Sequence, residues 1–320
     1  MSTFKRVDES IKVAIIGGGP SGLAAAIELA RLLFVEWQLY EQKPTISEIG
    51  TGITLQRSTW RLLEQLGASK HLRAEDFFRA PDGHDNQYRP VVKASDVEQI
   101  NGISKATVFW YSTDSKWIYT TPLDDSDWEI TCRVREAEGG DRSSWGREVS
   151  LADFLKGFQE YCEPVQQLLS LVSRVKRFDY FGGRRLQSVV KHGSVALIGD
   201  ASHPLSGAFG AGAAFALEDA HTLAGALLWA ASSKRDLADA LRLFDSVRSP
   251  YHSALYQTMD TIAASHEETS RNAASAEEEI VGRIENVSKP EHNWMYYHDV
   301  DQALEDAILA LEETAIKSVL

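Results

Sequence analysis

The chain has 320 residues, 43% of them hydrophobic, and its 33 basic and 46 acidic residues give a net charge of −13. A chain of this size can bury one large or two smaller hydrophobic cores. The acidic balance argues against a nucleic-acid partner and an anionic membrane surface, because both need clustered Lys and Arg. The two cysteines, Cys132 and Cys162, lack metal-ligand spacing and fit a reducing compartment.

Neither a secretory leader nor a transmembrane segment is expected. Residues 1–10 are polar and mixed in charge, unlike a signal peptide. The apolar stretch 208–231 is interrupted by Glu218, Asp219 and His221, which indicates a buried helix and not a membrane span. Together with the cysteine usage, these features predict a cytoplasmic protein without a metal site.

A glycine-rich turn lies near the N-terminus. Gly17, Gly19 and Gly22 follow the apolar run 13–16 and open the alanine- and leucine-rich stretch 23–33. This order predicts a strand, a tight turn and a helix whose first N–H groups can receive a pyrophosphate. Glycine is suited to this turn because it lets the backbone approach the phosphates and lets the helix pack closely on the strand.

Glu41 is the candidate ribose-binding carboxylate. It ends the predicted strand 36–40 and follows Gly22 at about the 20-residue spacing typical of dinucleotide-binding motifs. Its charge would repel a 2′-phosphate, so the motif favours FAD or NAD over NADP. The motif alone does not separate FAD from NAD, and a glycine turn without a ligand is the plainer alternative.

The middle of the chain mixes short strands with helices. Aromatic runs at 108–111 and 117–119 are typical of antiparallel strands. Helical patterns occupy 151–161 and 165–172, and the stretch 178–200 is predicted to return the chain to the first sheet.

A second glycine-rich segment follows. The apolar run 195–198 predicts a strand that ends at Gly199 and Asp200, and the run 207–213 leads into a long helix that is expected to end near Ala231. A strand, a carboxylate and a glycine-rich helix start therefore occur twice in the chain.

The C-terminal part is predicted to be mostly helical. Periodic segments rich in Ala, Leu, Glu and Asp lie at 241–264 and 300–316. The acidic run 277–279 is interpreted as the solvated face of a helix and not as a binding tail.

With these two segments the chain resembles the group A FAD-dependent aromatic hydroxylases, in the salicylate-hydroxylase-like branch common in fungal secondary metabolism. The resemblance is carried by Gly-Asp-Ala-Ser-His-Pro at 199–204, Ser-Glu-Ile-Gly-Thr-Gly-Ile at 47–53 and Trp-Met-Tyr-Tyr-His-Asp at 294–299. It implies an α/β fold, with a Rossmann-like FAD-binding domain of parallel strands and helices, a reduced and mostly antiparallel β substrate region, and C-terminal helices.

The same resemblance implies a division into domains. The FAD-binding domain would be discontinuous, formed by residues 1–72 and 186–235. A shortened substrate-binding region would occupy 73–185, and a C-terminal helical region would occupy 236–320.

The resemblance also implies which residues contact FAD. The ADP half would be held by Gly17, Gly19, Gly22 and Glu41, a further stretch along the cofactor would be lined by Gly52, and the ribityl and flavin half would be held by Asp200, Gly212 and Ala213. A helix N-terminus at Gly212 suits the flavin, because reduced flavin carries negative charge near N1 and O2.

The implied activity is hydroxylation of a phenolic or aromatic carboxylic acid by FAD, with NAD(P)H as reductant and O2 as co-substrate. No catalytic residue is assigned, and His203 is expected to be mainly structural. The candidates for contact with a substrate are Tyr111, Tyr119, Arg89, Arg133 and Arg135, although packing tyrosines and surface arginines are commoner in strands.

The chain departs from this family in its middle. It is shorter than the usual members, and the shortfall lies between Gly67 and Asp127. The segment 80–89 is either a β-turn, which is the simpler interpretation, or a degenerate remnant of a family motif. An alternative is therefore a flavin-binding relative without hydroxylase activity. An NAD-linked dehydrogenase is a third alternative, against which the Gly199–Asp200 segment argues.

Overall fold

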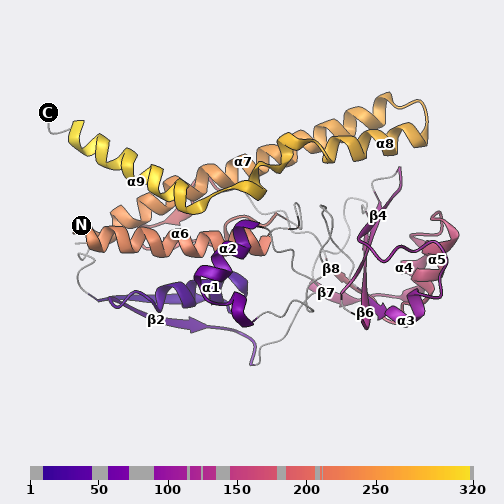
Figure 1. The fold of residues 1–320 in the computed structure, drawn as a ribbon, viewed down its shortest axis with the longest axis horizontal. Coiled ribbons are helices and arrows are strands. Elements are labelled where there is room, and N and C mark those ends of the chain that lie inside the picture. Colours follow the sequence, from indigo (N-terminus) through magenta and orange to yellow (C-terminus); the bar gives the residue numbers. More distant parts are fainter. Residues whose placement is uncertain are drawn as a thin grey trace.

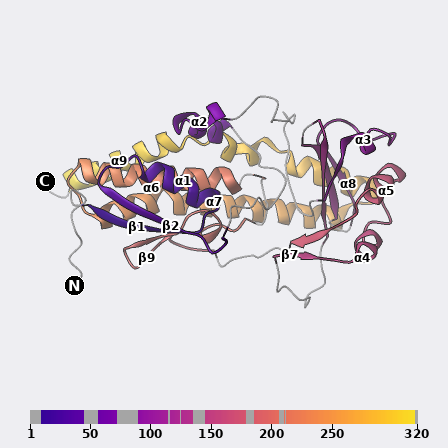
Figure 2. The same cartoon turned by 90° about the horizontal axis from the view of Figure 1, so that it is seen from below.

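The computed structural model of the chain describes residues 10–44, 57–71, 90–113, 116–123, 125–134, 145–178, 185–205, 210 and 212–317. Its two ends differ in architecture (Figure 1). A parallel strand pair with helices forms one end, and an antiparallel sheet with short helices forms the other. Helix α7 (Leu237–Asn272) runs along the molecule from the first end toward the second in both views, and α8 (Ala276–Val287) lies near the second end (Figures 1 and 2).

The first end is a β-α-β unit, as predicted. Strand β1 (Ile11–Ile16) pairs in parallel with β2 (Val35–Tyr40), and α1 (Pro20–Leu29) connects them. Pro20 suits the first turn of α1, because its fixed φ is helical and its missing N–H has no helical partner there. Helix α2 (Arg57–Gln65) and the short η1 (Ser69–His71) follow.

The second end contains a four-stranded antiparallel sheet in the order β3-β6-β5-β4. Its strands are β3 (Val91–Lys93), β4 (Val108–Tyr111), β5 (Trp117–Pro122) and β6 (Asp127–Arg133). The helices beside it are α3 (Ala94–Val97), α4 (Leu151–Lys156) and α5 (Glu163–Ser170). A two-stranded ribbon, β7 (Trp145–Glu148) with β8 (Lys176–Phe178), adjoins it.

One face of this sheet is the core of the second end. Ile118, Ile130 and Cys132 alternate along β5 and β6 and pack with Phe158 of the α4–α5 connection and Leu168 of α5. The predicted antiparallel strands are thus confirmed, while the helix expected over 151–161 ends at Lys156, just before Gly157.

The chain then returns to the first end through three short elements. These are β9 (Val190–Lys191), β10 (Val195–Ala196) and the 3-10 turn η3 (Gly199–Ala201). Strand β10 pairs with β9, so the expectation that it rejoins the first sheet is wrong for the described strands, of which only β1 and β2 pair in parallel. Leu197 and Ile198 still pack on the core of the first end.

Long helices complete the structure: α6 (Gly212–Ser232), α7 (Leu237–Asn272), α8 (Ala276–Val287), the 3-10 segment η5 (Pro290–Tyr297) and α9 (Val300–Lys317). The core of the first end joins β1 and α1 to α6, the start of α7 and α9, for example through Leu29, Leu227, Phe244 and Leu304. Residues from the predicted C-terminal region therefore share the core of the β-α-β unit, and the exact domain boundaries stay a prediction.

Two further expectations concern the long helices. In α8 the acidic run is largely solvated, since Glu277 and Glu278 are exposed, while Glu279 forms an ion pair of 2.6 Å with Arg283. Within the described part of the chain, no helix combines the length and the apolarity needed to cross a membrane.

Candidate functional site

The turn between β1 and α1 has a backbone that requires glycine at two of the three predicted positions. Gly17 has φ +105°, a conformation that other residues rarely adopt. A Cβ on Gly22 would lie 1.9 Å from the carbonyl oxygen of Gly17, which is far inside van der Waals contact. These two glycines let the strand turn sharply into α1.

Gly19 differs from both, because nothing in the fold requires glycine there. Its φ is −73° at the N-cap of α1, and no described atom lies within 4 Å of the position that a Cβ would occupy. No side chain caps the helix at this residue. The first turn of α1 thus presents free backbone N–H groups next to open space, as a pyrophosphate site needs.

Glu41 lies beside this turn, where the sequence predicts a ribose contact. Its Oε2 accepts a hydrogen bond of 2.7 Å from the backbone N–H of Gly18, and its Oε1 accepts one of 2.9 Å from the backbone N–H of Lys43. The hydrogen bond from Gly18, followed by that from Lys43, lowers the pKa of this exposed carboxyl below its ordinary value. Glu41 is therefore ionised near neutral pH and available to hydroxyl donors.

The second predicted segment packs directly against the first. Gly199 has φ +56°, and a Cβ there would lie 2.5 Å from the hydroxyl oxygen of Ser21 in α1 and 3.4 Å from Ala216 in α6. The loop that carries Asp200 consequently touches the start of α1 and the first turns of α6. Asp200 itself is exposed. The fold brings together two motifs that are about 180 residues apart in the sequence.

Among the described residues, the space next to Gly212 at the start of α6 is also empty. Gly212 is its first residue, no described atom lies within 4 Å of its would-be Cβ, and Ala213 next to it is only half-buried. Gly52 lies outside the described residues. The open glycines, the free helix start and the two accessible carboxylates are a donor and acceptor set that fits FAD.

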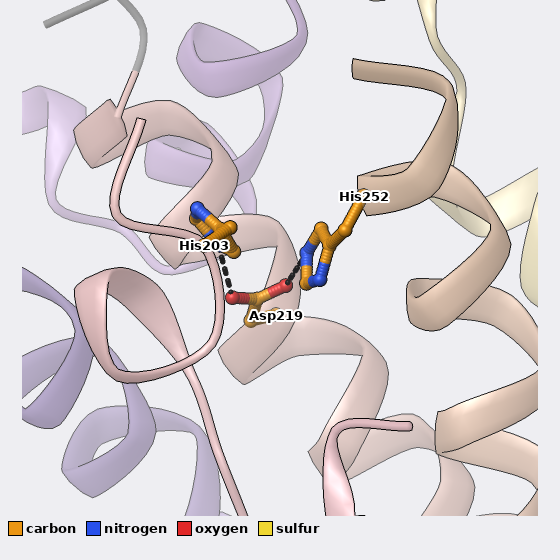
Figure 3. A group of neighbouring side chains, drawn as sticks. All are labelled: His203, Asp219 and His252. Atoms are coloured by element: carbon orange, nitrogen blue, oxygen red, sulfur yellow. Dashed lines mark hydrogen bonds and ion pairs between the residues drawn. The ribbon is translucent and has the colours of Figure 1, made fainter. Parts of the chain in front are cut away.

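Beneath this surface lies a buried polar cluster that the sequence did not predict. Asp219 of α6 stands between His203, which follows η3, and His252 of α7 (Figure 3). The distances from its oxygens to the two Nε2 atoms are 2.7 and 3.1 Å. Arg248 of α7 completes the cluster, with its Nε 2.7 Å from Asp219 Oδ1. The expectation that His203 is mainly structural agrees with its full burial.

The charges of this cluster shift several pKa values. Burial would raise the pKa of Asp219, but the neighbouring His203 and Arg248 hold it well below its ordinary value. Burial lowers the pKa of His252 to about 4. Burial also raises the pKa of Glu218 to about 7, although its Oε2 lies 3.2 Å from Arg248 Nη1. One guanidinium therefore serves two buried carboxyl groups.

Two histidines and a carboxylate at this spacing have ligand atoms close enough to hold a metal ion. The hydrogen bonds argue against that use. Both Asp219 oxygens already accept two N–H donors each, and the Arg248 cation occupies the side from which a second cation would be repelled. We assign this cluster to hydrogen bonding.

The antiparallel sheet offers a second feature, an aromatic wall on the face opposite its core. Phe109, Tyr111, Trp117 and Tyr119 share this face through direct cross-strand pairing, and the rings of Phe109 and Tyr119 lie 5.0 Å apart. Arg133 of β6 joins them, with its guanidinium carbon 5.9 Å from the Trp117 ring. The candidates Tyr111, Tyr119 and Arg133 thus lie on one surface, while Arg89 and Arg135 fall outside the described residues.

Sequence patterns missed Asp219, Arg248 and His252. A signal was present, because Glu218 and Asp219 interrupt an otherwise apolar helix. Two adjacent carboxylates in such a helix require buried cations or N–H donors. Their partners lie on α7, about 30 residues away, where no spacing rule points to them.

Known proteins are similar to this chain in sequence and in fold. Residues 10–89 match the family model described as FAD binding domain. Two salicylate hydroxylases of Pseudomonas putida are similar to this chain. One is 31% identical over 163 residues, which are 51% of this chain and 36% of the relative. The other is 30% identical over 167 residues, 52% of this chain and 37% of the relative. The matches thus span little more than a third of these relatives.

Solved structures share the fold over nearly the whole chain. A salicylate hydroxylase in a substrate complex has a TM-score of 0.70 at 18% identity, covering 93% of this chain and 98% of the other. CtdE in complex with FAD and a substrate has a TM-score of 0.69 at 13% identity, covering 95% and 99%. They confirm the predicted fold class, and the FAD-binding match confirms the predicted cofactor. Over about half of its length the chain is therefore similar to salicylate hydroxylases, and its N-terminal part matches an FAD binding domain.

Proposed function

We propose that this protein is an FAD-dependent monooxygenase that hydroxylates a phenolic or aromatic carboxylic acid, with NAD(P)H as reductant and O2 as co-substrate. The observation that carries this proposal is the packing of the Asp200 loop against the start of α1. Gly199 inserts between Ser21 and Ala216, so the carboxylate expected at the ribityl chain and the turn expected at the pyrophosphate belong to one surface. A dinucleotide site without flavin has no need for the second segment.

Bound FAD would supply the redox chemistry, and the protein would bind, orient and shield the reactants. Gly19 and the α1 N-terminus would hold the pyrophosphate, Glu41 would accept from ribose hydroxyls, and Asp200 would accept from the ribityl chain. The N-terminus of α6 at Gly212 would stabilise negative charge on the reduced ring.

The aromatic wall of the sheet is the candidate substrate surface. Phe109, Tyr111 and Tyr119 are half-buried, so they offer ring faces without being sealed into the core. Aromatic rings favour offset or edge contacts with an aromatic ligand. The guanidinium of Arg133, at the end of this wall, can donate two parallel hydrogen bonds to a carboxylate or a charge-assisted hydrogen bond to a phenolate.

The first experiment is the visible absorbance spectrum of the purified protein before and after addition of FAD, then NADPH and a panel of phenolic acids. The proposal expects bound flavin whose bleaching by NADPH is accelerated by one of the acids. Bound flavin that no acid affects would favour the alternative of a flavin-binding relative without hydroxylase activity. Absence of flavin binding would refute both.

Gly19 provides a variant that separates cofactor binding from folding. Gly19→Val places a side chain in space that the fold leaves empty, so the thermal midpoint of the cofactor-free protein is expected to change little. FAD affinity should fall by at least about tenfold, because the new side chain would stand between the backbone and the pyrophosphate. Gly22→Val is the contrasting variant, and its clash with Gly17 should disrupt folding itself.

A further inference from the structure

A single carboxylate fastens both ends of the loop that carries Asp200. Asp219 Oδ2 accepts a hydrogen bond of 2.8 Å from the backbone N–H of Gly199 and lies 2.7 Å from Nε2 of His203. Within the loop, the carbonyl oxygen of Gly199 accepts from the N–H groups of Ser202 and His203, at 2.8 and 3.0 Å. The loop is thus closed on itself and anchored to α6 at its first and last residues.

The other oxygen of the same carboxylate is held by α7. Asp219 Oδ1 accepts from Nε of Arg248 at 2.7 Å and lies 3.1 Å from Nε2 of His252. Four nitrogen donors, two from the loop and two from α7, therefore orient one side chain of α6. Such charge-assisted hydrogen bonds are roughly twice as strong as neutral ones, so the orientation is well determined.

Burial decides how this cluster can act. The side chains of Asp219 and His203 are both 0% exposed, so neither can touch a bound cofactor in this conformation. Asp200, three residues before His203, is exposed. Any influence of Asp219 on a cofactor must pass through the position of the loop.

We propose that Asp219 is a positioning residue for FAD, and that it sets where Asp200 meets the cofactor by tying Gly199 and His203 to α6. The inference rests on the proposed contact between Asp200 and FAD. It goes beyond that contact by assigning a function to two fully buried side chains, Asp219 and His203.

The arrangement determines that Nε2 of each imidazole carries a hydrogen. A carboxylate offers only lone pairs, so each Nε2 that faces Asp219 must carry the hydrogen. The Nδ1 atoms of His203 and His252 are buried and have no hydrogen-bond partner among the described residues. Histidine ¹⁵N spectra of the wild type should show Nε2–H on both rings, and an Nδ1–H tautomer on either ring would overturn the proposal without any variant.

The second test compares the two histidines, since both donate to Asp219 but only His203 belongs to the loop. FAD affinity is measured by flavin fluorescence at a temperature well below the thermal midpoint of each cofactor-free variant. His203→Ala is expected to weaken FAD binding about tenfold or more, the effect of losing one hydrogen bond to a charged group. His252→Ala should change it less than about threefold, because Arg248 still holds Oδ1.

His203→Gln is the conservative variant, since its amide nitrogen can replace Nε2, and it should recover most of the affinity. Equal losses in His203→Ala and His252→Ala would show that the cluster acts only through general stability and would overturn positioning. Wild-type affinity in His203→Ala would also overturn it while leaving the proposed function intact. Absence of FAD binding by the wild type would refute the proposed function, and this inference with it.

Discussion

Helix α6 takes part in two histidine–carboxylate contacts of opposite character. In the core, His203 and His252 meet Asp219, and burial lowers the pKa of His252 to about 4. Near the surface, His221 lies 2.7 Å from both Glu28 of α1 and Asp301 of α9. Burial alone would lower the pKa of His221, but the hydrogen bonds to Glu28 and Asp301 raise it.

The pKa values of His252 and His221 shift in opposite directions because their surroundings differ in burial and charge. In the core, burial disfavours a positive charge on His252 more than Asp219 favours it, and the nearby Arg248 cation adds to the lowering of the pKa. At the surface, two carboxylates surround one imidazole, and its protonated form is favoured. His252 therefore stays neutral around neutral pH, whereas His221 keeps its proton to a higher pH than an ordinary histidine.

The largest effect is expected when the core cluster loses its central charge. Among the described residues, Asp219→Asn leaves Glu218 as the one carboxylate paired with Arg248, and it weakens four hydrogen bonds. Removing one member of a buried ion pair costs about 3–5 kcal/mol. The free energy of unfolding from urea titration should fall by at least about 3 kcal/mol.

Glu279→Gln in α8 is the matched control, because this carboxylate also pairs with an arginine, at 2.6 Å, but is partly exposed. Its expected cost is below about 1.5 kcal/mol. Similar losses in the two variants would mean that burial does not distinguish the core cluster.

The next effect is a pH dependence that arises from Glu218. Its pKa of about 7 in the folded protein exceeds the ordinary value of 4.5. The stabilisation from its bound proton is complete below the unfolded pKa and is lost as pH rises through 7. Between pH 6 and 8 this group should reduce the free energy of unfolding by about 1 kcal/mol.

Glu218→Gln should remove that part of the pH dependence. Urea titrations of wild type and variant at pH 6, 7 and 8 measure it. His221→Gln is the control, since it removes a different titrating group and should leave the Glu218 contribution in place. If the free energy of unfolding of Glu218→Gln changed with pH as much as that of the wild type, the pKa of Glu218 would lie outside the range from pH 6 to 8.

The sequence could predict those motifs for which one short segment contains all the residues that the local structure needs. Gly17, Gly22 and Glu41 follow from the geometry of a strand–turn–helix, and the paired strands around Phe109 and Tyr119 follow from their aromatic runs. The wrong partner for β10 has a comparable cause. Val195–Ala196 forms a strand of two residues, and so short a segment does not specify which strand it pairs with.

The buried cluster lay beyond prediction because it depends on three distant segments. Nothing local to His252 distinguishes it from other helical histidines, and Asp219 reads as an interruption of an apolar helix. Only the packing of α7 on α6 shows that the buried charge of Asp219 is neutralised by Arg248. Long-range pairing of this kind has no signature in a single sequence.

A smaller effect is expected at the surface cluster. Asp301→Asn removes one of the two carboxylates at His221, with an expected cost of up to about 1 kcal/mol because Asp301 is partly exposed. The folded pKa of His221 is raised, so its contribution is complete below the unfolded value of 6.5 and is lost as pH rises through the folded value. The cost measured at pH 6 should exceed that at pH 8.5.

Asp299→Asn is the neighbouring control. Asp299 pairs with Arg61 at 2.7 Å and has no contact with His221 among the described residues, so the cost of this change should be the same at both pH values. A pH-independent cost for Asp301→Asn as well would show that His221 does not titrate in this range.

The smallest change in the free energy of unfolding is expected at an ion pair that has short hydrogen bonds but is exposed to solvent. Arg185 and Asp260 form two hydrogen bonds of 2.6 Å, yet their side chains are 52% and 57% exposed. Exposed pairs contribute about 0.2–1 kcal/mol and are screened by salt. Asp260→Asn should therefore cost less than about 0.5 kcal/mol in 0.5 M NaCl, measured by urea titration. A cost near that of Asp219→Asn would mean that bidentate geometry, and not burial, sets the contribution of an arginine–carboxylate pair in this protein.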